Sequence, residues 1–143
     1  MAVHSFDPKD VIIVIGGAPM QGFVDGEFVS FERTEDAFST TAGADGDVTR
    51  VKSNNKIGIL TLTLDQTSIS NDILSAFAQL DEKSNAGIVP IIIKEINGTT
   101  TVFSGTGWVM KMPVLNYGKE TSPREWAITV ADAEVFIGGN LIN

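Results

Sequence analysis

The chain has 143 residues, and its hydrophobic content of 43% is typical of a folded globular domain rather than a disordered segment. It has no cysteine and one histidine, which excludes disulfide scaffolds, thiolate metal sites and multi-histidine metal sites. Ten Lys and Arg against 18 Asp and Glu give a formal net charge of −8, which argues against a nucleic-acid-binding surface. We expect one domain over residues 1–143 that holds no cofactor and no metal.

Neither end of the chain suggests a targeting or membrane segment. Residues 1–10 lack the basic flank and the apolar run of a signal peptide. The longest apolar run, Val11–Ile15, is far shorter than the ~20 residues of a membrane helix. We expect no membrane insertion and a protein that stays in the cytoplasm or in a particle assembled there.

The first predicted strand, Val11–Ile15, is a continuous β-branched run of the kind found in strands buried on both faces. The glycine-rich residues 16–22 follow it. They lack the Lys-Ser/Thr pair and the following helix of a phosphate-binding loop, so we interpret them as a turn. A second strand, aromatic and partly alternating, is predicted over residues 27–33.

Residues 34–55 differ in composition from the rest of the chain. They are rich in Ser, Thr, Gly, Asp and Asn, with few apolar anchors such as Phe38 and Val48. Asp45-Gly46 is a hairpin-turn signal in the middle of the segment, and it lacks the further ligands of a calcium loop. We expect a long, poorly buried hairpin or loop that projects from the body and becomes ordered against a partner.

The clearest alternation lies in residues 56–66. Leu60, Leu62 and Leu64 fall on one face of the predicted strand, and Thr61, Thr63 and Asp65 fall on the other. A period of two predicts leucines directed into the core and polar side chains directed toward solvent or a partner.

One helix is predicted over residues 71–80, with Ser70 or Asn71 as its N-cap. Ile73, Leu74, Phe77 and Leu80 form an apolar stripe at helical spacing. The polar residues 81–85 and Gly87 are expected to end the helix. The stripe must pack against another element, most simply the sheet.

The last predicted elements are again strands. Residues 88–96 form a nearly continuous apolar run, and Asn97-Gly98 after it predicts a hairpin with a type I′ turn. The returning arm continues past Gly105 and Gly107, which suggest a bulge or a bend. Residues 125–130 alternate again. The predicted fold class is mainly β: an antiparallel β-sandwich or barrel of two packed sheets, with one flanking α-helix and a long projecting hairpin loop.

No segment points to catalysis. His4 has no apparent nucleophile or orienting partner, and acid pairs cannot be located from sequence because they converge only in three dimensions. Trp108 and Trp126 fit either the core or an exposed stacking platform. An acidic surface, a projecting polar arm and the apolar tail residues Leu141 and Ile142 favour a self-assembling structural protein over an enzyme.

Several stretches of the chain resemble the tail tube proteins of contractile-tailed bacteriophages. The resemblance extends over about residues 11–140. It rests on the order in which these stretches follow one another along the chain. They are residues 22–27 (GFVDGE), 43–50 (GADGDVTR), 60–68 (LTLTLDQTS) and 70–74 (SNDIL), with Arg124-Glu125-Trp126 and Gly139-Asn140.

This resemblance implies a structural role in the virion, assembled in the cytoplasm of the bacterial host. Such proteins form homohexameric rings that stack into a tube, and they meet the tail sheath protein, the baseplate and the tail terminator. Duplex DNA passes through the lumen without specific binding. The arm over residues 34–55 then corresponds to the stacking hairpin, and we expect ring-stacking and interface residues at Asp36, Phe38, Asp45, Asp47, Arg50, Lys52, Arg124, Leu141 and Ile142.

An acidic or neutral lumen lets DNA slide because it repels rather than binds phosphate. We expect the polar alternates Thr61, Thr63 and Asp65 to face the lumen. The alternative function is a β-sandwich binding module on a virion, which would recognise a carbohydrate or a host receptor through an exposed aromatic platform.

Overall fold

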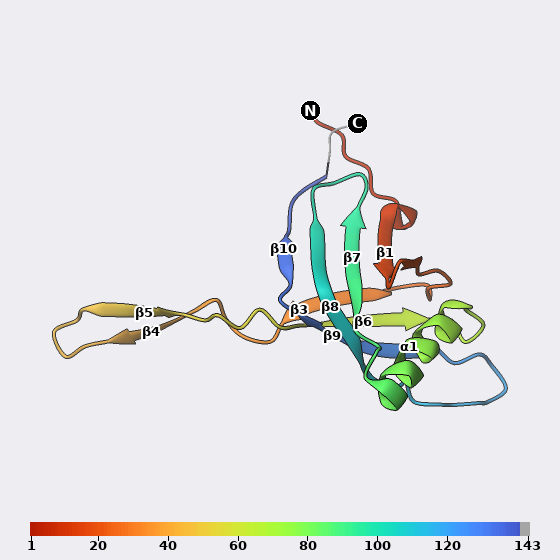
Figure 1. Ribbon diagram of the computed structural model, residues 1–143. Helices are drawn as coiled ribbons and strands as arrows, with labels where there is room; N and C mark the ends of the chain where they lie inside the picture. The colour runs from red at the N-terminus through yellow and green to blue at the C-terminus, as the bar shows by residue number, and fades with distance from the viewer. Residues whose placement is uncertain (141–143) are drawn as a thin grey trace.

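The computed structural model describes residues 1–140 and places most of its strands in one antiparallel sheet (Figure 1). The path of this eight-stranded sheet is β2-β1-β7-β8-β9-β6-β3, and β10 pairs with β8 beside it. β4 and β5 form a separate two-stranded sheet. The elements are η1 (Pro8–Asp10), β1 (Val11–Ile15), β2 (Ala18–Pro19), β3 (Val29–Arg33), β4 (Phe38–Ala42), β5 (Val48–Lys52), β6 (Gly58–Leu64), α1 (Ser70–Ser84), β7 (Val89–Glu95), β8 (Thr101–Lys111), β9 (Arg124–Ala131) and β10 (Glu134–Phe136).

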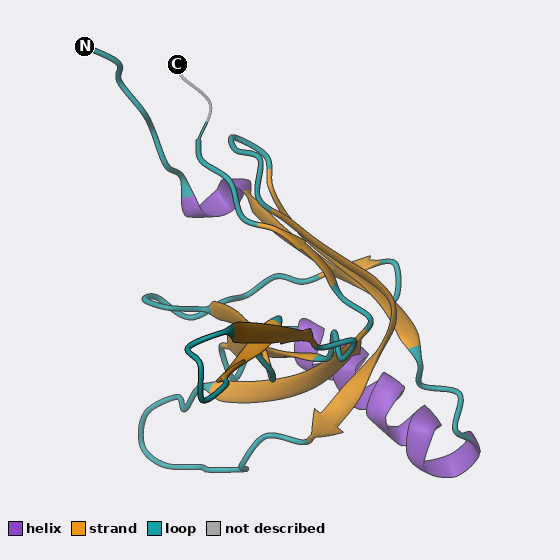
Figure 2. Cartoon of the chain, turned by 90° about the vertical axis from the view of Figure 1, so that its left-hand side faces the viewer, coloured by secondary structure: helices purple, strands orange, loops and turns teal. Residues whose placement is uncertain are grey.

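The long strand β8 bends this sheet into two layers. Its first part pairs with β7 and β10, and its second part pairs with β9. Register shifts in both ladders mark the bend, one between Val89 and Ile91 and the other between Val109 and Lys111. Such shifts let a strand turn without ending. The bend predicted from Gly105 and Gly107 is therefore confirmed, and Figures 1 and 2 show the two layers at a steep angle to each other.

The core lies between the layers and beneath α1. It joins buried side chains from both halves of the sheet with Leu74 of the helix, and Trp126 is its largest fully buried member. β6 follows the predicted pattern, because Leu60, Leu62 and Leu64 are fully buried. Burying these chains on one face stabilises the fold and sets the strand register, since a one-residue slip would expose all of them.

The predicted mainly β class, with antiparallel pairing and one flanking helix, is confirmed for the described residues. The two layers are halves of one continuous sheet rather than independent sheets, because β8 belongs to both. The described second sheet is the β4–β5 ribbon, which stands apart from the core (Figure 1).

The predicted N-cap of α1 is wrong. Ile69 occupies the cap position and makes no side-chain capping bond. Ser70 Oγ instead accepts a hydrogen bond from the main-chain N–H of Gln21, and Asn71 Nδ2 donates to the carbonyl of Asp65. These polar side chains hold loops against the helix. The helix also runs one turn further than expected, to Ser84, and ends at Asn85 with a left-handed φ of 57°.

The β7–β8 hairpin forms where it is predicted, but its turn is not type I′. That turn requires positive φ at both central residues, whereas neither Asn97 nor Gly98 has one. Residues 96–100 connect the strands, and Gly98 forms a bridge with Asn140. A Cβ on Gly98 would lie 2.9 Å from the carbonyl oxygen of Gly139. The glycine is needed here for the close approach of two chain segments.

Candidate assembly interfaces

The β4–β5 ribbon is exposed along its whole length. All ten of its strand residues are exposed, and it extends away from the body in Figure 1. Residues 43–47 connect the strands, with Gly46 at a φ of 87° and the N–H of Gly43 bonded to the carbonyl of Asp47 at 2.8 Å. A two-stranded ribbon is marginally stable by itself in water.

The two faces of the ribbon differ. Residues that pair directly share a face, so Phe38 lies with Lys52, and Thr40 lies with Arg50. On this face the Arg50 guanidinium stacks over the Phe38 ring at 4.3 Å from its centroid. The opposite face carries Ser39, Thr41, Thr49 and Val51. The first face therefore offers an aromatic and cationic surface, and the second a smaller, mostly hydroxyl-bearing one.

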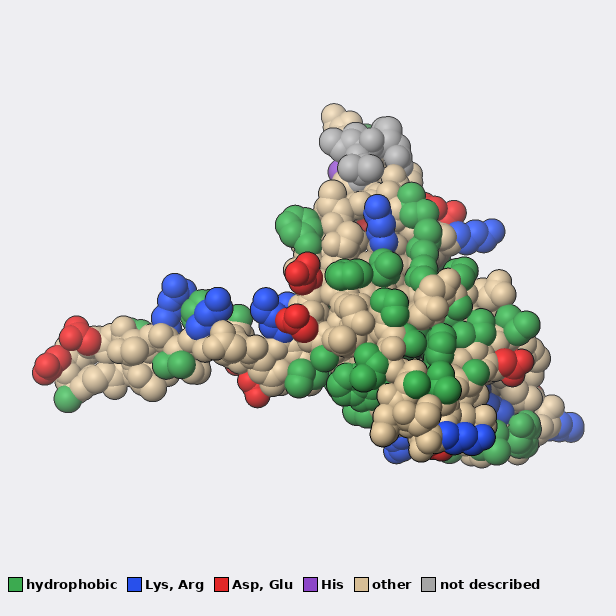
Figure 3. All heavy atoms as spheres, viewed as in Figure 1, with side chains coloured by type: hydrophobic (Ala, Val, Ile, Leu, Met, Phe, Trp, Pro, Cys, Tyr) green, Lys and Arg blue, Asp and Glu red, His purple; other side chains and the backbone are tan. Residues whose placement is uncertain are grey.

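Charge is separated along the ribbon. Asp45 and Asp47 lie in the connecting loop at its tip, and Arg50 and Lys52 lie on its shaft. Figure 3 shows acidic side chains at the free end and basic side chains nearer the body. Asp36 is exposed just before β4. The sequence-predicted interface residues from Asp36 to Lys52 thus share one projecting element.

The base of the ribbon is tied to the body. Arg33, the last residue of β3, donates from Nη2 to the carbonyl of Ala133, which is fully buried. The main-chain N–H of Thr34 donates to the carbonyl of Ile57 at 3.0 Å, and that of Ser53 donates to the carbonyl of Ala37 at 2.8 Å. The Thr34 bond continues the β3–β6 ladder outward, and the Ser53 bond continues the β4–β5 ladder toward the body.

Arg124 lies far from the ribbon along β6. The hairpin leaves where Arg33 pairs with Gly58, whereas Arg124 pairs with Leu64 at the opposite end of that strand. Arg124 is only 6% exposed. Its Nη1 donates to the carbonyl of Ser122 at 3.2 Å, and its guanidinium lies 5.3 Å from the centroid of the Tyr117 ring. Leu141 and Ile142, the other predicted interface residues, lie outside the described residues.

Thr61 and Thr63 lie on the outer face of the β3–β6–β9 layer, here called the polar face. They are half-buried and sit opposite Ala127 and Glu125 of β9. Asp65 is exposed just beyond the end of β6. Ser30, Glu32 and Thr129 share this face through their register with β6. The face therefore carries carboxylates and hydroxyls together with Ile59, and Lys111 of β8 lies beside it through its pairing with Ala127.

A second outer face, which the sequence analysis did not single out, belongs to the β1–β7–β8–β10 layer. Its strands present the exposed side chains of Ile12, Ile92, Phe103 and Phe136, here called the apolar face. Figure 3 shows hydrophobic side chains gathered over this part of the body. Exposed apolar patches of this kind mark interaction surfaces. The signal in the sequence is the lack of alternation in Val11–Ile15 and residues 88–96. The prediction that Val11–Ile15 is buried on both faces is wrong, because Ile12 is exposed.

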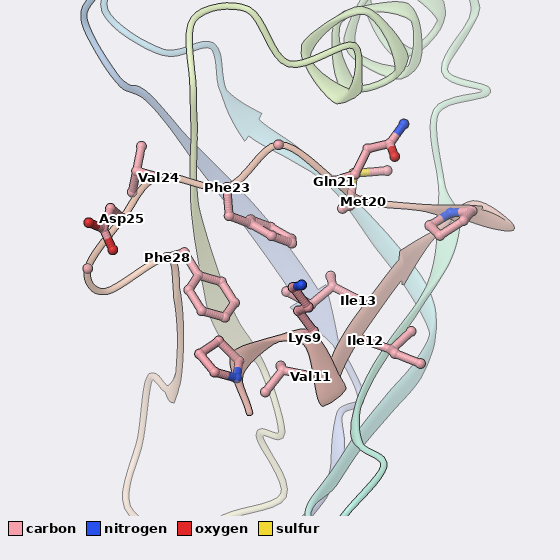
Figure 4. Close-up of a pocket in the computed structure, with 14 residues that line it drawn as sticks. Lys9, Val11, Ile12, Ile13, Met20, Gln21, Phe23, Val24, Asp25 and Phe28 are labelled. Atoms are coloured by element: carbon pink, nitrogen blue, oxygen red, sulfur yellow. The ribbon is translucent and has the colours of Figure 1, made fainter. Parts of the chain in front are cut away.

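A groove of about 630 Å³ opens between β1 and the segment leading into β3. Figure 4 shows Val11, Ile13, Phe23 and Phe28 around it, and the rings of Phe23 and Phe28 are 4.8 Å apart. β3 and the short β2 end the path of the sheet. The sheet curves without closing, and this groove lies at the opening.

The two tryptophans do not form one aromatic platform. Trp126 is 1% exposed and packs in the core with Ile128. Trp108 pairs with Thr129, which lies on the opposite side of β9 from Trp126 and Ile128. Their side chains therefore point to different faces of the sheet.

Within residues 1–140, no group of three or more His, Cys, Asp or Glu side chains is placed to hold a metal ion. In the same part of the chain, no helix has both the length and the apolar character needed to cross a membrane.

An exposed ribbon and an exposed apolar sheet face are the kinds of surface through which structural proteins contact partners. The chain belongs to the bacteriophage PhiTE tail tube protein family, whose profile matches residues 1–138. It is 31% identical over 144 residues to "Structural protein ORF10" of Pseudomonas phage KPP10, covering 95% of this chain and 83% of that protein. The chain is thus a structural phage protein.

Solved structures with similar folds have only low sequence identity to this chain. The cap that terminates the tube of the anti-feeding prophage has a TM-score of 0.59 at 10% identity, over 95% of this chain and 93% of that one. A chain of the native gene transfer agent virion has a TM-score of 0.62 at 11% identity, over 93% and 100%. The sheath/tube terminator of PVC, an extracellular contractile injection system, has a TM-score of 0.58 at 11% identity, over 96% and 100%. These likenesses show the fold.

Proposed function

We propose that copies of this chain form closed hexameric rings that stack into the hollow inner tube of a contractile phage tail. Duplex DNA leaves the virion through this tube. The rings are assembled in the cytoplasm of the bacterial host. The proposed partners are other copies of the chain, a surrounding sheath protein, a baseplate that starts the tube and a terminator that ends it.

The observation that carries this proposal is the β4–β5 ribbon. Its strand residues are all exposed, and it has an aromatic and cationic face and an acidic tip. The exposed surface of such an element is available for contact with a neighbouring subunit. Its position outside the core supports a role in joining one ring to the next.

The open sheet edges and the apolar face support lateral contacts within a ring. β3 lies at one end of the sheet path and has a free edge, which invites pairing with another chain. A closed ring satisfies every such edge at once. The apolar face, with Ile12, Ile92 and Phe103, would also be removed from water by a neighbour.

The polar face is the better candidate for the lumen. It combines Thr61 and Thr63 with the carboxylates of Glu32 and Glu125. DNA carries about one negative charge per 1.7 Å of axis, so an acidic wall repels it and a basic wall would slow it. This favours passage of DNA without binding.

A virion binding module for a carbohydrate or a host receptor is the second candidate. It would need an exposed aromatic platform with saturable binding. The burial of Trp126 and the opposite orientation of Trp108 count against it.

Negative-stain electron microscopy of the purified chain over a concentration series, with light scattering for mass, tests the proposal. We expect hexameric rings and hollow tubes. Replacing residues 38–52 with a short Gly-Ser linker should leave the circular dichroism spectrum of the body unchanged and abolish stacking. A chain that stays monomeric at every concentration, even after addition of a baseplate or tail-tip partner, would contradict the proposal.

A further inference from the structure

A pocket of about 300 Å³ surrounds Arg124, between the start of α1 and the loop that follows β8. Gln66, Tyr117 and Leu115 line it together with Arg124, and no carboxylate is among its lining residues. We call it the Arg124 pocket. The main-chain N–H of Ser122 donates to Gln66 Oε1 at 3.1 Å, which fixes the loop beside the arginine.

Among the described residues that line this pocket, no carboxylate pairs with Arg124, whose guanidinium lies over the Tyr117 ring. A guanidinium has five N–H donors, and the hydrogen bond described for this group runs from Nη1 to the carbonyl of Ser122. Burying a charge is costly unless it is paired. A carboxylate is the natural partner, because it accepts two parallel hydrogen bonds from an arginine. An acidic group from outside the subunit would supply such a partner.

The chain itself presents such a group at the end opposite the pocket. The ribbon leaves the body at the Gly58 end of β6, and Arg124 lies beside Leu64 at the other end, about 20 Å away at the usual rise of a strand. In Figure 1 the ribbon and the loop after β8 extend from opposite sides of the body. A projection at one end and a receptor at the other make a head-to-tail contact, which repeats into an open stack.

We propose that the Arg124 pocket receives the acidic tip of the ribbon, Asp45 or Asp47, from a second copy of the chain. This inference rests on the proposed function and names the surface on which the stacking ribbon docks. The groove of Figure 4 is larger, but it is lined by both Lys9 and Asp25 and offers no such charge match. In this contact a carboxylate accepts two parallel hydrogen bonds from the guanidinium. The paired bonds fix the position of one subunit relative to the next, in addition to the attraction between the charges.

Disulfide cross-linking tests the contact directly, since the chain has no cysteine of its own. One variant carries Asp47→Cys at the tip and Tyr117→Cys at the pocket, where the native tyrosine is 75% exposed. Mild oxidation should produce a ladder of covalent multimers well beyond the dimer. Each single variant should stop at the dimer. Asp47→Cys combined with Lys56→Cys, an exposed position near the Gly58 end of β6 and away from the pocket, is the matched control and should give no ladder.

The same preparations are imaged for tubes, which separates this inference from the proposed function. A ladder together with tubes supports both. Tubes without a ladder overturn the Arg124 pocket as the docking site and leave the tube in place. A ladder without tubes supports the docking contact and counts against the tube. The absence of both counts against both proposals.

Charge reversal gives a second readout, which begins with variants that leave the buried Arg124 unchanged. Asp45→Lys with Asp47→Lys should raise the protein concentration needed for assembly about thirtyfold or more, because Arg124 then stays unpaired. Asp25→Lys with Glu27→Lys makes the same change in net charge on another exposed loop and should change it less than about threefold. Adding Arg124→Glu to the tip reversal should restore assembly. Equal effects of the two reversals would overturn the proposal.

Discussion

The indole Nε1 of Trp126 donates a hydrogen bond to Asn71 Oδ1 at 2.8 Å. This bond joins the centre of β9 to the first turn of α1. Through Nδ2, Asn71 also donates to the carbonyls of Asp65 at 2.9 Å and Ser68 at 3.1 Å. One amide thus satisfies a buried indole and holds the β6–α1 loop, and Trp126 in turn forms part of the floor of the Arg124 pocket.

Asn71→Ala should therefore destabilise the fold by about 2 kcal/mol. The substitution leaves the indole N–H of Trp126 without its acceptor and removes the side-chain donor to the loop carbonyls. Thermal and urea unfolding measure the change. Asn54→Ala, at an exposed position on the way from β5 to β6, is the control and should change the free energy of unfolding by less than about 0.5 kcal/mol. Equal stabilities of the two variants would show that the bond contributes nothing.

Even the smallest side chain at Gly107 is predicted to destabilise the fold. A Cβ there would lie 2.1 Å from Ile91 Cδ1 and 3.3 Å from the carbonyl oxygen of Thr129. Gly107→Ala should cost about 1–3 kcal/mol through overpacking at the bend of β8. Gly105→Ala is the control, because its Cβ would meet nothing within 4 Å.

The same clash predicts a rescue. Ile91→Val removes the Cδ1 atom and by itself should cost about 1 kcal/mol. Combined with Gly107→Ala, it should give a double variant that is more stable than the sum of the single effects by about 1 kcal/mol. Strict additivity in chemical denaturation would mean that the strain comes from contacts other than Ile91 Cδ1, such as Ile91 Cγ1 at 2.9 Å or the Thr129 carbonyl oxygen.

Phe38 is predicted to matter for assembly and very little for folding. Its ring stacks on Arg50 in an exposed ribbon, so Phe38→Ala should change the free energy of unfolding by less than about 1 kcal/mol. The concentration needed for tube formation, followed by light scattering, should rise by about tenfold or more, since aromatic anchors dominate interfaces. Thr41→Ala, on the other face of the ribbon, should have a much smaller effect. A Phe38→Ala protein that assembled like the wild type would exclude this face from the contact.

Placing cations on the polar face tests its assignment to the lumen. Thr61→Lys with Thr63→Lys should still fold, because both positions lie on the outer side of β6. Tubes with this wall should slow the exit of DNA, since each lysine attracts phosphate. Phage particles that carry the variant are scored for the rate of DNA ejection. Ala76→Lys with Gln79→Lys, on the exposed side of α1, adds the same charge and should leave the rate unchanged. Unaffected ejection from the Thr61/Thr63 variant would place another face in the lumen.

Much of the local structure follows from residue patterns. Alternating leucines in β6 predict a strand with one buried face, because a period of two leaves no other way to bury all three. The helical spacing of Ile73, Leu74 and Phe77 predicts α1 for the same reason. The polar composition of residues 34–55 predicts their exposure, since that segment has too little apolar surface to join a core.

The predictions of the α1 N-cap and of the type I′ turn are wrong because long-range contacts override the local preferences of these residues. Ser70 and Asn71 have the chemistry of helix caps, but in the folded chain they bind Gln21 and the β6–α1 loop. Asn97-Gly98 has the composition of a type I′ turn, but Gly98 is held by a bridge to Asn140. Local propensity is worth a few tenths of a kcal/mol to about 1 kcal/mol, so a hydrogen bond to a distant segment overrides it.

By itself, the sequence determined the fold class, the mainly acidic charge, the separation of core and arm, and the family resemblance. Only the tertiary structure decided that one sheet supplies both layers, that the apolar face is exposed, and that Arg124 is buried at the end of β6 opposite the ribbon. Periodicity assigns a residue to a face of its own strand. The bend of β8 decides which face of each strand meets the core and which residues pack there. Contacts between distant segments of the chain set this bend.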